Sequence, residues 1–366
     1  MHFGRRTGSR PASRPTSHRH DADHGAGPQS QPGPPDRAGA HRRIGGRLTN
    51  SPSMRKAESW AMDKYKGWGL SNIRRDPFVF GRGWYFTNAS ISMTAPRLVH
   101  MTAIPVAWTP GTNGTIKAEI VVAPMARVKD FDAWKGKLKG KIVLVSLPGT
   151  GSEPDKAPFQ RYTAEDIKKM DTYDLPNYDP DSVERAATRR SFEKRLDEFL
   201  VSEGALGWAK ISARDGGLVH GTGYNYRVGH SPALPAFEIA AEDYRRLARL
   251  AKVGPAPVVE MASDARFDDS DVNAYNIIAE IPGSDPKAGY VMAGAHLDSW
   301  VAADGAVDNG AGSAMIMEAA RILQATGAKP KRTIRFVLWA GEEQGAARQP
   351  GLCREISGEP PGGRAQ

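Results

Sequence analysis

The sequence predicts an α/β fold with a second domain inserted ahead of its clearest strand–helix–strand unit. Residues 290–295 and 333–340 are short apolar runs typical of buried strands. Residues 312–327 carry apolar side chains at helical spacing and end on Gly327, a residue type favoured at helix C-termini. Two strands joined by a helix over about 50 residues form a βαβ unit, with parallel strands and a right-handed crossover.

The N-terminal 43 residues are rich in Arg, Ser, Pro, Gly and His and contain almost no large apolar side chains. Such a segment cannot bury a core, so we expect residues 1–43 to be a disordered basic tail. Its five histidines lack regular spacing, which favours a solvated segment over a metal-binding tract.

Order is expected from residue 44. Ser51 is a suitable N-cap and Pro52 a suitable first helical residue, so a helix should begin there and end at the glycines near residue 67. Strand-like stretches follow at 78–80 and 84–93. We assign residues 44–97 to the N-terminal part of the main domain.

A separate domain is predicted over residues 98–267, where short apolar runs alternate with turns marked by Gly and Pro. The highly charged stretch from residue 152 is expected to be an insertion loop leading into a helix. The expected strands are 116–122, 141–147, 208–211 and 258–261, and the expected helices are 191–201 and 240–251.

The α/β pattern occupies residues 268–345 and begins with a strand at 277–281. Residues 346–366 contain three prolines and four glycines, and no element is expected in them. We therefore interpret residues 346–366 as a disordered tail.

Composition excludes several classes of function. No apolar run approaches the roughly 18 residues of a membrane-spanning helix, and no apolar segment follows Arg5 and Arg6 as a signal peptide requires. The formal net charge is +9, but nine arginines and three aspartates before residue 48 already account for +6. A specific nucleic-acid groove in the folded part is therefore not indicated. Cys353 is the single cysteine, so it forms no intrachain disulfide, and the compartment is left open.

Three polar clusters follow one another in the α/β region. His296 and Asp298 come at the end of one predicted strand, Asp308 comes 12 residues after His296, and Glu342 and Glu343 come at the end of the next strand. The carboxyl ends of parallel strands are where α/β sheets place their ligand sites. The clusters are therefore expected to meet.

These residue types suit a hydrolytic metal site. Imidazole and carboxylate are zinc ligands, and a carboxylate can bridge two metals. A second carboxylate that is not a ligand can accept a proton from water, and Asp298 can orient the His296 ring from behind. Taken singly, each cluster is more often structural: a satisfied histidine, a surface Glu-Glu pair or an Asp-Asn-Gly turn. Their order on one βαβ unit favours the metal site.

The strings at 290–345 resemble the di-zinc aminopeptidases and the carboxypeptidase Q-like enzymes, including the entry to the last strand at 331–335. Residues 44–69, with Arg47-Leu48-Thr49 and Ser51-Pro52, resemble the first helix region of that family. Residues 98–267 resemble the protease-associated domain that many members carry. The resemblance implies a partial zinc-exopeptidase catalytic domain, a mixed sheet flanked by helices, with an inserted protease-associated α+β domain.

The resemblance also implies roles for the site residues. His296 ligates one zinc, Asp308 bridges two, Glu342 is the general base and Glu343 ligates the other zinc. The peptide bond between Asp308 and Asn309 is often cis in the family. Family substrates are peptides or dipeptides, and members are typically secreted or periplasmic.

The resemblance stops after Gly345, and the chain has no histidine after His296. A complete family site contains two zincs and takes an Asp and a His from that later part of the chain, so we expect the second zinc site to lack ligands here. One hypothesis is a truncated zinc exopeptidase that binds zinc weakly and has little or no activity. The alternative is a non-catalytic peptide- or protein-binding remnant built on the protease-associated domain. Nonspecific nucleic-acid binding by the basic tail is a third reading, and oligomeric state and side-chain preference are left open.

Overall fold

The computed structural model describes residues 44–151, 161–170 and 181–345. The predictions for the tails at 1–43 and 346–366, and for Cys353, fall outside these ranges. Among the described residues, no helix combines the length and the apolar character that crossing a membrane requires. The strands form a sheet of four, a sheet of eight and a two-stranded ribbon.

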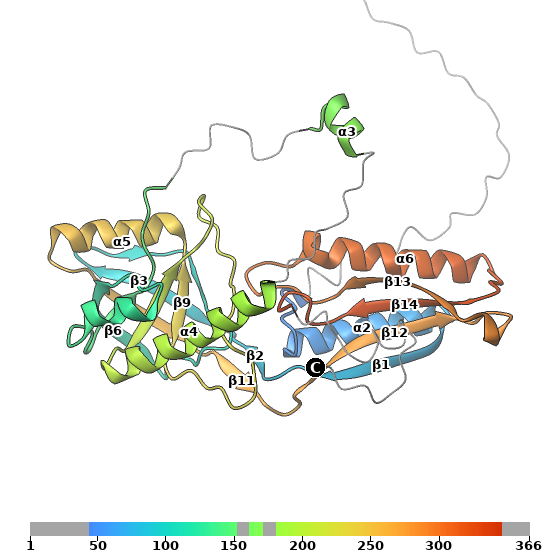
Figure 1. Ribbon diagram of the computed structural model, residues 1–366, viewed down its shortest axis with the longest axis horizontal. Helices are drawn as coiled ribbons and strands as arrows, with labels where there is room; N and C mark the ends of the chain where they lie inside the picture. The colour runs from blue at the N-terminus through green and yellow to red at the C-terminus, as the bar shows by residue number, and fades with distance from the viewer. Residues whose placement is uncertain (1–43, 152–160, 171–180, 346–366) are drawn as a thin grey trace, which may run out of the picture. The chain divides into compact units, whose positions relative to one another are not determined.

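The four-stranded sheet has the order β1-β12-β14-β13, visible as neighbouring arrows in Figure 1. The central strand β14 pairs antiparallel with β12 and parallel with β13, so the sheet is mixed. In the parallel pair His296 lies opposite Trp339, so β13 and β14 both end at the same edge of the sheet. The strands are β1 (Ser71–Val79), β12 (Asn273–Ile281), β13 (Tyr290–His296) and β14 (Thr333–Trp339).

Two helices pack on one face of this sheet. Helix α2 (Pro52–Gly67) begins as expected, with the Ser51 side chain accepting a hydrogen bond from the N–H of Met54. Helix α6 (Ala311–Ala325) links β13 to β14 and makes the parallel βαβ unit that the sequence predicts. Apolar side chains of both helices share one buried cluster with alternate residues of β12 and β14, namely Ile277, Ala279, Phe336 and Leu338.

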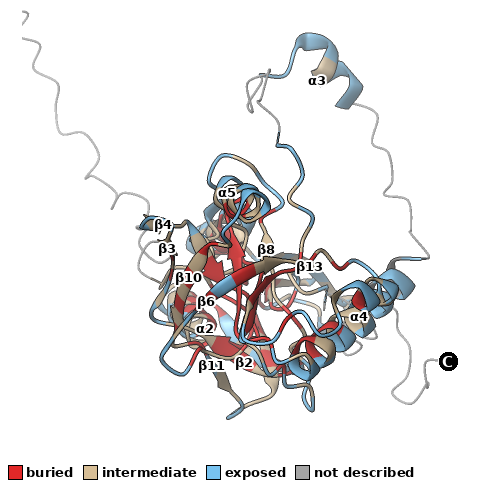
Figure 2. Cartoon of the chain, turned by 90° about the vertical axis from the view of Figure 1, so that its left-hand side faces the viewer, coloured by how far each residue is buried: buried red, intermediate tan, exposed pale blue. Residues whose placement is uncertain are grey.

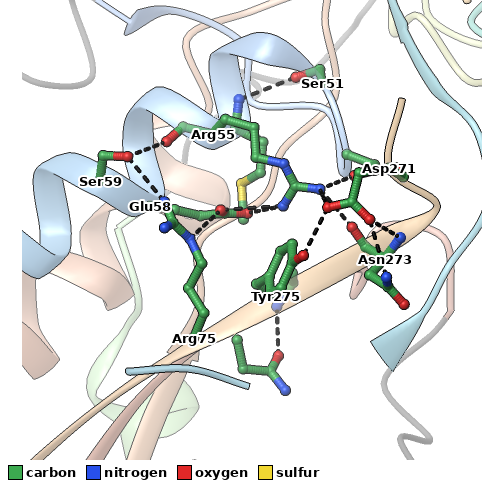
Figure 3. Close-up of polar contacts among 12 residues, drawn as sticks. Ser51, Arg55, Glu58, Ser59, Arg75, Asp271, Asn273 and Tyr275 are labelled. Atoms are coloured by element: carbon green, nitrogen blue, oxygen red, sulfur yellow. Dashed lines mark hydrogen bonds and ion pairs between the residues drawn. The ribbon is translucent and has the colours of Figure 1, made fainter. Parts of the chain in front are cut away.

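A polar cluster joins α2 to β1 and β12, as Figure 3 shows. The Glu58 carboxylate is fully buried and pairs with Arg55 at 2.9 Å and Arg75 at 3.3 Å. Arg55 also lies over the Tyr275 ring at 4.5 Å, and the Tyr275 hydroxyl donates to Asp271 at 2.7 Å. A buried carboxylate is tolerated because two guanidinium groups compensate its charge.

The eight-stranded sheet has the order β4-β3-β10-β6-β7-β8-β9-β5. Side chains of β7 alternate between two buried clusters: Ile142 and Leu144 lie with α5, and Val143 lies with α4. The helices therefore cover opposite faces. The strands are β3 (Ala89–Ala95), β4 (Val99–His100), β5 (Ala103–Pro105), β6 (Thr115–Val122), β7 (Ile142–Leu144), β8 (Gly207–Ile211), β9 (Ala236–Ile239) and β10 (Val258–Ser263).

The remaining elements connect these layers. Residues along α3 are nearly all exposed, in contrast to the buried strands of the large sheet (Figure 2). The elements outside the two large sheets, other than α2 and α6, are α3 (Ala164–Met170), α4 (Ser182–Ser202), α5 (Ala241–Val253), β2 (Gly83–Tyr85), β11 (Arg266–Asp268) and the short helical turns η1 (Val128–Trp134), η2 (Pro286–Ala288) and η3 (Ala306–Gly310). The large sheet already includes β3, ahead of residue 98, and the domain boundaries at 97 and 267 stay predictions.

Several elements differ from their expected extents. The strand expected at 84–93 is two strands, β2 and β3, because the Asp264 carboxylate accepts the N–H groups of Thr87 and Asn88 at 2.8 Å and turns the chain between them. The helix expected at 191–201 is the longer α4, and the strand expected at 78–80 is the end of the longer β1.

Candidate metal centre

His296 is the last residue of β13, and its ring is held from behind. Its Nδ1 lies 3.1 Å from the backbone carbonyl oxygen of Asp298. Because a carbonyl oxygen only accepts, Nδ1 carries the proton in the neutral ring and the lone pair is on Nε2. The backbone carbonyl of His296 accepts a hydrogen bond from the Ser313 hydroxyl of α6 at 2.7 Å, which fixes the strand end against the helix.

The Nε2 atom of His296 faces two carboxylates. It lies 3.1 Å from Oδ1 of Asp308 and 3.7 Å from Oε2 of Glu342. Asp308 has an extended backbone, and the peptide bond to Asn309 is cis, as the resemblance implies. The Asn309 side chain accepts a hydrogen bond from the N–H of Gly312 at 3.0 Å and leads the chain into α6.

Glu342 and Glu343 follow β14 in a turn that Gly341 opens with a φ of 81°. A positive φ suits glycine because it has no Cβ to clash with the backbone. The Glu342 side chain is half-exposed, whereas Glu343 is partly buried. The parallel register of β13 and β14 brings this turn to the edge where His296 lies.

Asp298 is fully buried behind His296, Glu342 and Glu343. Its carboxylate accepts hydrogen bonds from the N–H of Glu343 at 3.1 Å, the N–H of Glu342 at 3.4 Å and the hydroxyl of Thr49 at 3.0 Å. Its Oδ1 also lies 3.5 Å from Nδ1 of His296. One carboxylate therefore contacts the ends of both parallel strands.

The electrostatics of the cluster follow from crowded acidic groups. Burial opposes the protonated imidazole of His296, but its hydrogen bond to Asp298 and the charges of Asp298 and Glu342 outweigh burial and raise its pKa to about 9. Burial, together with the charges of Asp308 and Asp298, raises the pKa of Glu343 to about 7. A divalent cation relieves this repulsion between like charges.

His296, Asp308 and Glu343 can each offer one donor atom so that all three atoms lie within 4.8 Å of one another. Imidazole nitrogens and carboxylate oxygens are both zinc ligands, and catalytic zinc sites use three protein ligands. The geometry therefore fits a metal ion. The structure brings together the five residues singled out in the sequence: three around a common point, Glu342 beside them and Asp298 behind them.

Three residues in contact with the site were not singled out in the sequence as site residues. Arg47 and Thr49 appeared only as part of the resemblance, and Ser313 not at all. Arg47 and Thr49 reach the loop after His296 by hydrogen bonds that span about 250 residues of chain. No local spacing marks such contacts, so only the run Arg47-Leu48-Thr49 offered a signal.

Known proteins match both the sequence and the fold. The family model for peptidase family M28 matches residues 276–348, which include all five site residues. Carboxypeptidase Q of Bos taurus is 28% identical over 307 residues, covering 82% of this chain and 56% of that protein. The crystal structure of a peptidase M28 precursor from Shewanella amazonensis SB2B matches with a TM-score of 0.60 and 25% identity, covering 88% of this chain and 66% of that chain. Residues 276–348 therefore match a peptidase M28 domain.

A zinc aminopeptidase from Bacillus subtilis has the same fold as this chain, with a TM-score of 0.52, 18% identity and coverage of 84% of this chain and 60% of that chain. The expected α/β class with a mixed sheet is thus confirmed. The matches to the curated carboxypeptidase Q proteins cover most of this chain. They span only about half the length of those relatives.

Proposed function

We propose that this chain is a zinc-dependent exopeptidase of peptidase family M28, of the aminopeptidase or dipeptidase type. The observation that carries the proposal is the meeting of donor atoms from His296, Asp308 and Glu343 within 4.8 Å. The zinc aminopeptidase with the same fold supports zinc as the metal. Peptides with a free N-terminus, or dipeptides, are the proposed substrates.

His296, Asp308 and Glu343 would hold the metal. Zinc supplies a Lewis acid that polarises the substrate carbonyl and makes water acidic enough to attack near neutral pH. Asp298 keeps the proton on Nδ1 of His296, so that Nε2 points its lone pair at the site.

Glu342 is the proposed general base. Its side chain is half-exposed and its Oε2 lies 3.7 Å from Nε2 of His296, beside the donor cluster. A carboxylate in that position can accept a proton from the attacking water and pass it to the leaving amine. Its backbone N–H is held by Asp298, which leaves the side chain to reach the substrate.

One zinc is the proposed stoichiometry for this chain. Within residues 44–151, 161–170 and 181–345, the donors of His296, Asp308 and Glu343 form the one group of three or more that could hold a metal. Asp308 keeps a second carboxylate oxygen that can bridge to another metal. The complete family arrangement holds two zincs, so we propose weak turnover for a chain that holds one.

The protease-associated identity of residues 98–267 and a secreted or periplasmic location are further parts of the proposal, both from the family resemblance. Fractionation of the native host tests the location: the protein is expected in the periplasm or medium, and recovery in the cytosol alone would contradict it.

Metal analysis with an activity assay tests the function. The purified 366-residue chain is stripped with a chelator, reloaded with zinc, analysed by plasma mass spectrometry and assayed on aminoacyl p-nitroanilides and dipeptides. About one zinc per chain, with slow turnover that Glu342→Gln abolishes, supports the proposal. Zinc without turnover favours a peptide-binding protein, and absence of zinc binding contradicts the metal site itself.

A further inference from the structure

We propose that Arg47 and Thr49 act as a clamp that sets the positions of the metal-binding side chains before any metal is present. Both are positioning residues, since neither is among the three proposed zinc ligands. The clamp lies on the segment just before α2, far in the chain from the ligands that it serves. The inference rests on the proposed metal site and adds two residues to it.

Arg47 fixes the loop between His296 and Asp308. Its buried guanidinium donates to the carbonyl oxygens of Leu297 at 2.7 Å, Asp304 at 2.6 Å and Gly305 at 2.9 Å. Leu297 follows the first ligand directly, whereas Asp304 and Gly305 precede the second. One rigid planar group therefore sets the separation between the two ends of the loop.

The backbone of Arg47 strengthens the same contact. Its N–H donates to the Ser299 hydroxyl at 3.0 Å, and its carbonyl accepts the Ser299 N–H at 3.1 Å. Gly305 has a φ of 59°, and a Cβ there would lie 2.9 Å from the Arg47 guanidinium and closer still to Ser299. The loop thus approaches Arg47 as closely as glycine allows.

Thr49 connects the clamp to the third ligand. Its hydroxyl donates to Oδ2 of Asp298 at 3.0 Å, the same oxygen that accepts the N–H of Glu343 at 3.1 Å. Both Thr49 and Asp298 are fully buried. The hydroxyl therefore holds the carboxylate in the orientation that fixes the Glu343 turn.

The clamp is itself anchored in the core. Leu48, between the two clamp residues, is fully buried in the cluster under the four-stranded sheet. Its carbonyl accepts the N–H of Ser51 at 2.9 Å, and Ser51 caps α2. Partners that orient ligands from behind change metal affinity by about 10–100-fold when they are removed. A purely structural role predicts a loss of stability without that change.

Thr49→Val tests the hydroxyl, with Thr49→Ser as the conservative variant. Thr109→Val is the matched control, because Thr109 is also fully buried and its hydroxyl donates to a carbonyl, that of Val106, at 2.7 Å. Zinc dissociation constants are measured by competition with a chromophoric chelator. We expect Thr49→Val to weaken zinc binding about 10–100-fold, with Thr49→Ser and Thr109→Val close to wild type. Equal affinities in Thr49→Val and Thr109→Val would overturn the role of Thr49.

Arg47 is tested without any metal. Arg47→Lys keeps the positive charge but loses the planar fork, and Arg47→Met loses both. Hydrogen exchange of the metal-free chain follows the amides of residues 297–305. We expect exchange about tenfold faster or more in both variants, because lost hydrogen bonds ease local opening. Exchange rates in this loop equal to those of the wild type would overturn the clamp. The exchange experiment also tests the clamp if Thr49→Val does not fold.

The two failures are distinguishable. If the wild-type chain binds no zinc, the proposed function fails while the exchange experiment still measures the clamp. If the wild type binds zinc and the clamp variants bind it equally well, the proposed function stands and the clamp is wrong.

Discussion

The carboxylate of Asp298 accepts a hydrogen bond from the N–H of Glu343 at 3.1 Å, across 45 residues of chain. This bond joins the segment after β13 to the turn after β14, so the two parallel strands are tied at the edge where the donor cluster forms. The relative positions of the proposed ligands thus depend on a residue that is not itself among them. Variants of Asp298 should therefore affect the metal and the fold together.

We expect Asp298→Asn to lower both stability and zinc affinity. The amide has one oxygen, so in either rotamer its NH₂ group faces the N–H of Glu342 or of Glu343. A buried donor without an acceptor lowers the unfolding free energy by about 1–3 kcal/mol. Loss of a group that orients ligands should weaken zinc binding about 10–100-fold. Urea denaturation and zinc competition measure the two effects.

Asp197→Asn is the control for Asp298→Asn. Asp197 is also buried and accepts the N–H of Ala233 at 3.2 Å, but it lies on α4, which covers the eight-stranded sheet. Its variant should lose stability and keep zinc affinity. If Asp298→Asn bound zinc as the wild type does, the account of Asp298 would be wrong.

The two adjacent glutamates should separate metal binding from proton transfer. Glu343→Gln removes a charged donor, so zinc binding should weaken by more than about 100-fold, beyond the usual range for residues that only orient ligands. Glu342→Gln should keep zinc affinity within a few-fold, while turnover falls by about 10²–10⁴-fold for loss of a general base. Equal effects of both variants on zinc affinity would count against this assignment of roles.

Removing zinc should lower the melting temperature of the wild-type chain, and this effect should depend on His296 as a ligand. A ligand that binds only the folded state at 100 times its dissociation constant stabilises it by about 2.7 kcal/mol. A chelator should therefore destabilise zinc-loaded wild type but leave His296→Ala unchanged. His100→Ala is the control, because His100 is exposed on β4 with Ser92 at 2.9 Å. A chelator response that survives in His296→Ala would place the zinc elsewhere.

Much of the α/β region could be predicted from its sequence because its signals are local. The strand expected at 333–340 is β14 (Thr333–Trp339), and the helix expected at 312–327 is α6 (Ala311–Ala325). β1 (Ser71–Val79) was largely missed because Arg74, Arg75, Asp76 and Pro77 do not read as a strand. Pro77 is tolerated there because, within the described residues, β1 pairs on one side only, with β12.

The candidate site divides in the same way. His296, Asp308 and Glu343 stand at strand or helix ends, and the parallel βαβ unit was enough to bring them together in prediction. Arg47 and Thr49 act through hydrogen bonds to residues about 250 positions away. Such contacts form only in the folded chain and leave no local pattern in the sequence.

The buried Glu58 should give the protein a pH-dependent stability. Burial raises the pKa of Glu58, although the charges of Arg55 and Arg75 oppose the shift. A carboxyl with a higher pKa in the folded state stabilises that state fully below its unfolded pKa, and this contribution is lost as pH rises through the folded pKa. Glu58→Gln cannot titrate, so its stability relative to wild type should improve as pH rises above the ordinary carboxyl pKa of about 4.

Urea denaturation at several pH values measures this difference. Glu260→Gln is the control for removing one acidic residue, since Glu260 is half-exposed on β10. Its difference from wild type should stay nearly constant with pH. A Glu58→Gln difference that stayed flat, or moved in the opposite direction, would show that Arg55 and Arg75 outweigh burial.

The central claim is that His296, Asp308 and Glu343 share one zinc ion. A crystal structure of the zinc-loaded 366-residue chain, with anomalous data collected on both sides of the zinc absorption edge, tests it most directly. We predict one strong peak about 2.0–2.2 Å from Nε2 of His296 and from an oxygen of each carboxylate. Zinc-saturated crystals with no peak at these atoms, or with the ion bound elsewhere, would contradict it.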